Sequence, residues 1–382
     1  MNYPIYLDYN ATTPCTPEVI EAMLPYFGVH FGNAASKSHP YGWVAENAVE
    51  TAREQIANLL GAQSKEIIFT SGATEAINLA IKGIFNLKKG EKQHFITCQT
   101  EHKAVLDTFK SIESEGAEVT YLPVNREGKI DLDQLKSAIL PHTKIIALMW
   151  ANNETGVIHP MAEIKKIAEE HDIILFTDAV QAAGKIPVSV KGIHLMAISA
   201  HKLYGPKGVG ALYVRHNHPL PKPLAQIDGG GHEKGFRSGT LNVPGIVGFG
   251  KAAELRLKVM ESEGKRLEIL RNRLESKVLE LPDTFLNGVQ KERLPHVTNL
   301  AFGRVEGVEL LQKLNQKVAV SSGSACTSIS PKPSHVLQAM GLESDLGRAS
   351  VRFSLGKETT ESDIDFTIEW VKKVIEGLRQ GI

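Results

Sequence analysis

Short apolar runs alternate with amphipathic stretches along the first half of the chain. In the amphipathic stretches apolar residues recur three or four positions apart, as at Ile77, Ala80, Ile81 and Ile84, which is the spacing of a helix that buries one face. Continuous apolar strands that alternate with helices predict an α/β fold, in which a mostly parallel sheet is covered on both faces. The predicted strands are 67–70, 94–98, 118–122, 144–150, 173–177, 195–199 and 210–214.

The pattern changes in the last third of the chain. A long, charged helix is predicted from Pro244 to about Glu280, followed by short strands and a final amphipathic helix. Thr360 opens that last helix, and Asp363 three residues later completes a capping-box pattern. Its buried stripe is expected to be Ile364, Ile368, Val371, Ile375 and Leu378. The short strands are 298–302, 318–321 and 350–355.

A chain of 382 residues is long for a single hydrophobic core and favours two domains. The change of pattern suggests where they divide. We expect a large domain over residues 16–260 and a smaller α+β domain made of residues 1–15 and 261–382.

Charge and cysteine content narrow the class of protein. Lys plus Arg equals Asp plus Glu at 43 each, which argues against direct nucleic-acid binding and against attachment to an anionic membrane. No apolar run approaches the roughly 18 residues of a membrane span, and the N-terminus has no signal-peptide pattern. The three cysteines, Cys15, Cys98 and Cys326, are odd in number and far apart, so neither a disulfide framework nor a metal site is expected. We therefore expect a cytoplasmic protein with reduced thiols.

Polar residues follow most of the predicted strands directly. Because the carboxyl ends of parallel strands share one edge, where such sheets bind ligands, we expect these residues to converge on one crevice. Loops are polar in any protein, which accounts for one or two of them but poorly for a lysine, an aspartate and two histidines at one edge. They are Thr74, His102, Asn153, Asp178, Gln181, His201 and Lys202.

Asp178 and Lys202 carry the most specific chemistry in this set. A carboxylate that ends an apolar strand needs a cationic or donor partner, such as a protonated pyridine nitrogen; the alternative, equally weighted, is that Asp178 caps a helix. Lys202 follows an apolar strand and a histidine and precedes a Gly-Pro turn. That context favours a positioned amine capable of forming a Schiff base over an ordinary solvated lysine.

Three further segments have a functional and a plainer interpretation. Residues 71–75 join a strand to a helix, so their backbone N–H groups and the Thr74 hydroxyl suit a phosphate. The alternative is that Thr74 simply caps the helix.

Arg352 alternates with apolar neighbours in a strand and suits a substrate carboxylate. The alternative, and the usual interpretation, is an ordinary surface arginine. Cys326 lies in a polar, proline-ended stretch and is expected to be exposed and mobile, whereas Cys15 and Cys98 fit ordinary structural thiols.

Eight short motifs, taken in this order and spacing, are highly specific together. They are residues 6–14 (YLDYNATTP), 70–75 (TSGATE), 100–103 (TEHK), 152–156 (NNETG), 178–181 (DAVQ), 199–202 (SAHK), 237–240 (RSGT) and 321–326 (SSGSAC). Over nearly its whole length the chain resembles the cysteine desulfurases, pyridoxal-phosphate enzymes of fold type I. Its long segment around Cys326 is similar to that of the nitrogenase-associated and general iron–sulfur assembly group. The resemblance implies a large domain with a mostly parallel seven-stranded sheet.

The resemblance also implies how the cofactor, pyridoxal 5′-phosphate, is held. Lys202 would form the Schiff base and act as the base at Cα, and His102 would stack on the ring and take part in acid–base steps. Asp178 would pair with the ring nitrogen, and Gln181 would contact the ring hydroxyl. The remaining cofactor contacts would come from Ala73, Thr74, Asn153, Ser199 and His201, and from Thr240 of the other subunit of a homodimer.

The implied reaction removes sulfur from L-cysteine. Asn153 and Arg352 would hold the substrate carboxylate, and Cys326 would take the sulfur as a persulfide while L-alanine leaves. The sulfur would go to a protein acceptor such as an iron–sulfur scaffold, where Cys326 could transiently contact a cluster, or to other thiolation. The alternatives are a selenocysteine lyase or another fold type I enzyme, and a non-catalytic relative that kept the fold.

Overall fold

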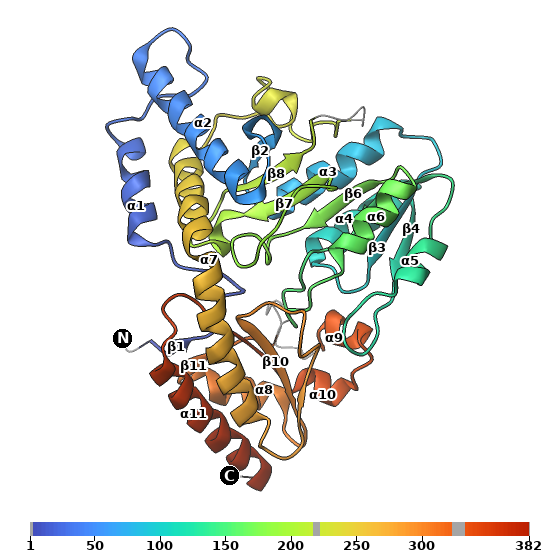
Figure 1. Ribbon diagram of the computed structural model, residues 1–382, viewed down its shortest axis with the longest axis vertical. Helices are drawn as coiled ribbons and strands as arrows, with labels where there is room; N and C mark the ends of the chain where they lie inside the picture. Colours follow the sequence, from blue (N-terminus) through green and yellow to red (C-terminus); the bar gives the residue numbers. More distant parts are fainter. Residues whose placement is uncertain (1–2, 217–221, 323–332, 382) are drawn as a thin grey trace.

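The computed structural model describes residues 3–216, 222–322 and 333–381. Its largest element is a seven-stranded sheet with the strand order β2-β8-β7-β6-β5-β3-β4 (Figure 1). Its strands are β2 (Ile67–Thr70), β3 (His94–Cys98), β4 (Glu118–Leu122), β5 (Thr143–Ala147), β6 (Ile174–Asp178), β7 (Leu195–Ser199) and β8 (Gly210–Val214). Strand β8 is antiparallel to both of its neighbours, and every other pairing is parallel. The predicted α/β fold with a mostly parallel seven-stranded sheet is therefore confirmed.

The apolar runs form strands because the sheet is buried on both faces. Alternation sends Ile145 and Phe176 into one core, and Ile146 and Leu175 into the other. Helices α3 (Ala73–Leu87) and α4 (Lys103–Glu113) cover the first face, and α2 (Pro40–Leu60), α6 (Met161–Glu170) and the first part of α7 (Val243–Val278) cover the second. The predicted strand 144–150 ends early, at Ala147, but Leu148 and Trp150 still donate backbone hydrogen bonds to β6.

Helix α7 leads from the large sheet to a second, smaller assembly (Figure 1). That assembly contains the antiparallel sheet β12-β10-β9 and the two-stranded pair β1-β11. The strands are β1 (Ile5–Tyr6), β9 (Thr284–Leu286), β10 (Val297–Phe302), β11 (Val318–Ala319) and β12 (Ser350–Ser354). The sequence did not predict β1 and β9, which are only two and three residues long. The predicted strand 318–321 is also shorter than expected, although Ser321 still forms a bridge to Arg352.

The last helix, α11 (Glu361–Gln380), matches its prediction closely. Thr360 and Asp363 form the capping box, and the predicted stripe lies in the core of the smaller assembly, with Leu378 partly buried at its end. The other helices are α1 (Pro17–Met23), α5 (Leu132–Ser137), α8 (Gly307–Asn315), α9 (His335–Ala339) and α10 (Ser344–Arg348), and short 3-10 helices occupy Leu24–Phe27, Ser64–Glu66, Ala200–Lys202 and Glu233–Gly235. Across the three described stretches of chain, no helix combines the length and apolar character needed to cross a membrane.

Candidate active site

The carboxyl ends of the parallel strands form one edge, and Gly210 at the start of β8 lies there against the loop that leads into α3. Gly210 pairs with Ser199 on one side and with Thr70 on the other. A Cβ at this glycine would lie 2.7 Å from the backbone of Gly72, so a larger residue would push away the start of α3. The glycine thus lets the chain before Ala73 and Thr74 pass beside the strand end that carries Ser199.

No side chain among the described residues caps the start of α3. Gly72 is the N-cap and supplies no side-chain cap, Ala73 is the first helical residue, and the Thr74 side chain is exposed. The simple capping role considered for Thr74 is therefore not what the structure shows. Uncapped N–H groups at a helix start, together with a hydroxyl, suit an anion such as a phosphate.

Lys202 ends the short 3-10 helix that follows β7. Its amine donates to the backbone oxygens of Asn10, at 2.5 Å, and Ala11, at 2.6 Å. Burial and, after it, the positive charge of Arg352 lower the pKa of Lys202 to about 8, against the opposing effect of Asp8 and Asp178. An amine in this position is partly uncharged near neutral pH and can act as a nucleophile or a base.

Asp178 is the last residue of β6 and is only 7% exposed. One carboxylate oxygen accepts the N–H of Val180 at 2.9 Å, but the chain that follows is a series of turns, so Asp178 does not cap a helix. Burial raises its pKa, while the charges of His102 and Lys202 oppose that shift. No ion pair reaches Asp178 within the described part of the chain, and a buried carboxylate of this kind fits a cationic ring nitrogen.

The two histidines of the edge differ in exposure and in the partner of Nδ1. His102 is exposed and precedes α4, and its Nδ1 accepts the N–H of Ala104 at 3.1 Å, which puts the proton of the neutral ring on Nε2. His201 is partly buried, and its Nδ1 lies 3.2 Å from the Thr12 hydroxyl. Burial, followed by the charge of Lys202, lowers the pKa of His201 to about 4.

Asn10 joins the sheet edge to the smaller assembly, and sequence reasoning assigned it no role. It is 1% exposed, and its backbone oxygen accepts from Lys202 and, at 3.1 Å, from the Gln181 side-chain amide. Its own side-chain amide donates to the Asn153 oxygen at 2.9 Å. Lys185, also missed, donates to Gln181 Oε1 at 2.5 Å and so fixes which end of that amide points toward Asn10.

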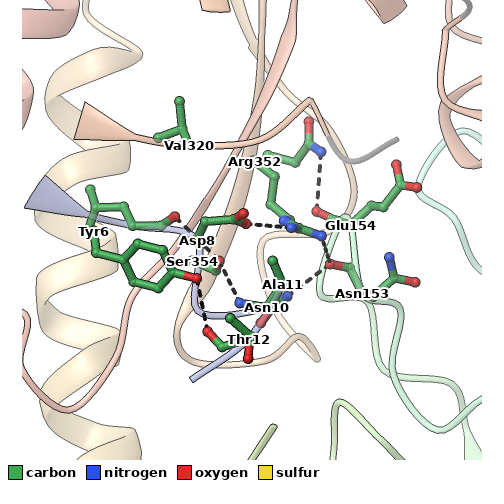
Figure 2. A network of polar contacts seen from close by, with 12 residues as sticks. Tyr6, Asp8, Asn10, Ala11, Thr12, Asn153, Glu154, Val320, Arg352 and Ser354 are labelled. Carbon is green, nitrogen blue, oxygen red and sulfur yellow. Dashed lines mark hydrogen bonds and ion pairs between the residues drawn. The ribbon is translucent and has the colours of Figure 1, made fainter. Parts of the chain in front are cut away.

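Arg352 lies opposite the sheet edge, inside a polar network (Figure 2). It is 5% exposed, so the reading as a surface arginine is wrong. Its Nη2 donates to Asp8 Oδ1 at 2.6 Å and its Nη1 to the Asn153 oxygen at 3.0 Å. The buried Nε–H has no hydrogen-bond partner in the described stretches, so the guanidinium retains capacity for a further acceptor.

Two predicted residues are not joined to this cluster. Thr240 is exposed, and its side chain forms no hydrogen bond within residues 3–216, 222–322 and 333–381. Cys326 lies outside the described residues. The described residues around it are close to the site, because Ser321 bridges to Arg352 and the Ser334 hydroxyl donates to the carboxylate of Glu154, the neighbour of Asn153.

The other two cysteines, Cys15 and Cys98, are poorly suited to act as nucleophiles. Cys98 is fully buried, and its sulfur lies 3.2 Å from the Thr100 hydroxyl. Burial raises the pKa of Cys98 to about 12 and also raises the pKa of Cys15. Both thiols therefore stay protonated near neutral pH, and a protonated thiol is a weak nucleophile.

Comparison with known proteins places this site in a family. The class-V aminotransferase family model matches residues 5–366. The protein described as cysteine desulfurase IscS of Anaeromyxobacter dehalogenans is 52% identical over 383 residues, covering 100% of this chain and 94% of that protein. The human cysteine desulfurase is 49% identical over 380 residues, covering 99% of this chain and 83% of that protein.

A solved structure agrees with the sequence comparisons. A protein described as NifS-like superimposes with a TM-score of 0.91 at 34% identity, covering 98% of this chain and 100% of the other. Its likeness extends over both the large sheet and the smaller assembly, because almost nothing of either chain is left out. The chain therefore belongs to the class-V aminotransferases and, within them, to the cysteine desulfurases.

Proposed function

We propose that this cysteine desulfurase uses pyridoxal 5′-phosphate to take sulfur from L-cysteine, releases L-alanine and carries the sulfur as a persulfide on Cys326. One observation carries the proposal. The Lys202 amine, its pKa lowered by burial, is linked through Asn10 and the Asn153 oxygen to the buried guanidinium of Arg352. The charge of Lys202 also acts on the carboxylate of Asp178, which has no ion pair among the described residues. A base, an acceptor for a cationic ring and a carboxylate ligand are the three parts that this reaction requires.

The cofactor fits the groups that the site leaves open. Lys202 would hold it covalently, Asp178 would accept from the ring nitrogen, and Gln181, oriented by Lys185, would contact the ring hydroxyl. His102 would stack on the ring, with Asn153 close to it. The phosphate would lie against Ala73, Thr74, Ser199 and His201, with Thr240 of the partner subunit. Bound there, pyridoxal 5′-phosphate supplies an electron sink for the charge that develops when Cα loses its proton.

Different residues of the chain carry out the separate steps of the reaction. Arg352 and Asn153 bind the carboxylate of L-cysteine and orient its Cα–H bond. Lys202 removes that proton and later returns a proton to the product, and His102 serves as an acid–base group. The Cys326 thiolate attacks the substrate sulfur, so an S–S bond forms as the C–S bond breaks. L-cysteine and the Cys326 thiol thereby become L-alanine and a Cys326 persulfide, with no external oxidant or reductant.

A homodimer is the expected assembly, and an exposed apolar surface supports it. Eight large apolar residues between positions 20 and 44 are 40% exposed or more, and exposed apolar area of this size is typical of an interface. They are Ile20, Leu24, Phe27, Val29, Phe31, Tyr41, Trp43 and Val44. Light scattering should find a dimer, and Trp43→Glu should weaken it; an active wild-type monomer would rule the shared site out.

The chain would divide into two domains and pass its sulfur to another protein. We place the large domain at residues 16–260, and the smaller domain at 1–15 and 261–382, which the separate core shared by Leu7, α11 and the small sheet supports. The acceptor would be a cytoplasmic protein, such as an iron–sulfur scaffold.

Mass spectrometry of the intact protein after mixing with L-cysteine tests the central proposal. One added sulfur that maps to Cys326 by peptide analysis, together with an equal amount of L-alanine, is the expected result. Release of sulfur without any labelled residue would favour a direct lyase. A large preference for selenocysteine over cysteine in the same assay would favour a selenocysteine lyase.

A further inference from the structure

The Arg352 guanidinium is held by an ion pair that no step of the proposed reaction uses. Asp8 Oδ1 lies 2.6 Å from Arg352 Nη2, and the two side chains are 20% and 6% exposed. The backbone fixes this pair, because Tyr9 donates to the Ser354 oxygen at 3.2 Å and Ser354 donates to the Leu7 oxygen at 2.8 Å. Asp8 is thus held against the same strand, β12, that carries Arg352 (Figure 2).

The pair leaves room for a second carboxylate on the same arginine. A guanidinium has five N–H donors, and the described contacts use one toward Asp8 and one toward the Asn153 oxygen. The Nε–H is buried without a partner in the described residues. Nη1 and Nη2 each carry a second hydrogen that no contact among the described residues uses, so a substrate carboxylate can bind Arg352 while Asp8 stays in place.

The charge of Asp8 then determines how strongly that carboxylate is held. With Asp8 present, an incoming carboxylate meets a neutralised pair and a like charge nearby; without it, the carboxylate meets an uncompensated buried cation. The influence of Asp8 already reaches the centre of the site, where its charge raises the pKa of Lys202 while that of Arg352 lowers it.

We propose that Asp8 is a positioning residue whose charge moderates the affinity of Arg352 for α-carboxylates, so that L-alanine, which keeps the carboxylate of the substrate, can leave. The inference rests on the proposed function, because it takes Arg352 as the carboxylate ligand. It gives the 6–14 segment a role in substrate and product exchange as well as in supporting Lys202.

The test measures equilibrium binding of L-alanine to the cofactor-loaded enzyme. Asp8→Asn keeps the shape and removes the charge, so it should bind L-alanine about tenfold more tightly, with KM for L-cysteine and kcat both lowered. Asp8→Glu, which keeps the charge, should bind L-alanine like the wild type. Asp365→Asn is the matched control, since Asp365 pairs with Arg273 at the same 2.6 Å far from the site, and it should change nothing.

Two further measurements separate the possible failures. Binding of cysteamine, which lacks the carboxylate, should be unchanged in Asp8→Asn. Unchanged or weaker L-alanine binding in Asp8→Asn, or tightening in Asp8→Glu as well, would overturn the inference. If Arg352→Gln leaves L-alanine binding unchanged, the assignment of the carboxylate site fails instead. Asp8→Ser also removes the charge and serves if Asp8→Asn does not fold.

Discussion

The site lies between two walls that are built in different ways. The wall at the sheet edge presents single side chains, such as Asp178 and His102, each placed by the end of a different buried strand or the helix after it. The opposite wall, made by residues 8–11 and β12, presents backbone oxygens and the Asp8–Arg352 pair. Groups on the first wall are left open toward a ligand, whereas groups on the second largely satisfy one another.

This difference separates two kinds of contribution. On the sheet edge the identity of a side chain decides whether the chemistry occurs at all. On the second wall the Asp8–Arg352 pair and the backbone oxygens decide how tightly the Lys202 amine and a substrate carboxylate are bound. Substitutions on the sheet edge should therefore abolish the reaction, and those on the second wall should tune it.

The largest effect is expected for Lys202→Ala. Loss of both the covalent attachment point and the base should lower kcat by about 10⁴-fold, the upper range for a general base. Borohydride reduction followed by peptide mapping should find the cofactor on Lys202 of the wild-type protein and nowhere in the variant. Lys103→Ala removes the exposed lysine next to His102, and Lys207→Ala removes an exposed lysine five residues after Lys202; both variants should behave like wild type. Attachment at either of them would refute the assignment.

Cys326→Ser should separate cofactor chemistry from sulfur transfer. The hydroxyl keeps the shape but loses the readily ionised sulfur, so the variant should bind pyridoxal phosphate and L-cysteine yet form no persulfide and little L-alanine. Stopped-flow spectra and an L-alanine assay measure the two parts separately. Cys15→Ser is the control and should stay near wild type. Sulfide release by Cys326→Ser at the wild-type rate, without added thiol, would disprove the nucleophile assignment.

Much of the first wall could be predicted from the sequence, since its signals are local. Apolar runs located all seven strands of the large sheet, and the polar residues after them lie at its carboxyl edge as expected. The second wall carries no such signal. The oxygens of Asn10 and Ala11 belong to the backbone, and Asp8 and Arg352 are 344 positions apart. Periodicity also could not show that Arg352 is buried, because that depends on packing between the two parts of the chain.

Arg352→Gln should weaken substrate binding more than it slows the chemistry. A charge-assisted hydrogen bond to a carboxylate contributes about 1.5–3 kcal/mol, so KM for L-cysteine should rise by roughly 10- to 150-fold with a smaller loss in kcat. Steady-state kinetics measure both constants. Arg273→Gln removes an exposed guanidinium from the Asp365 pair and should leave both unchanged. If kcat fell by roughly 10- to 150-fold while KM stayed unchanged, Arg352 would act only in the transition state.

The smallest expected effect is a shift in the pH dependence of cofactor attachment to Lys202. It tests whether the charges of the second wall act on a group of the sheet edge. Covalent attachment of pyridoxal phosphate to the cofactor-free protein needs the uncharged amine, and burial together with nearby charges lowers the pKa of Lys202 from 10.5 to about 8. The attachment rate should therefore rise with pH and level off above about 8. Arg352 lowers this pKa and Asp8 raises it, so the inflection should move up in Arg352→Gln and down in Asp8→Asn. Stopped-flow absorbance across the pH range measures each inflection. An inflection near 10.5 in the wild type, or shifts in the reverse directions, would show that the charges of the second wall do not reach the amine.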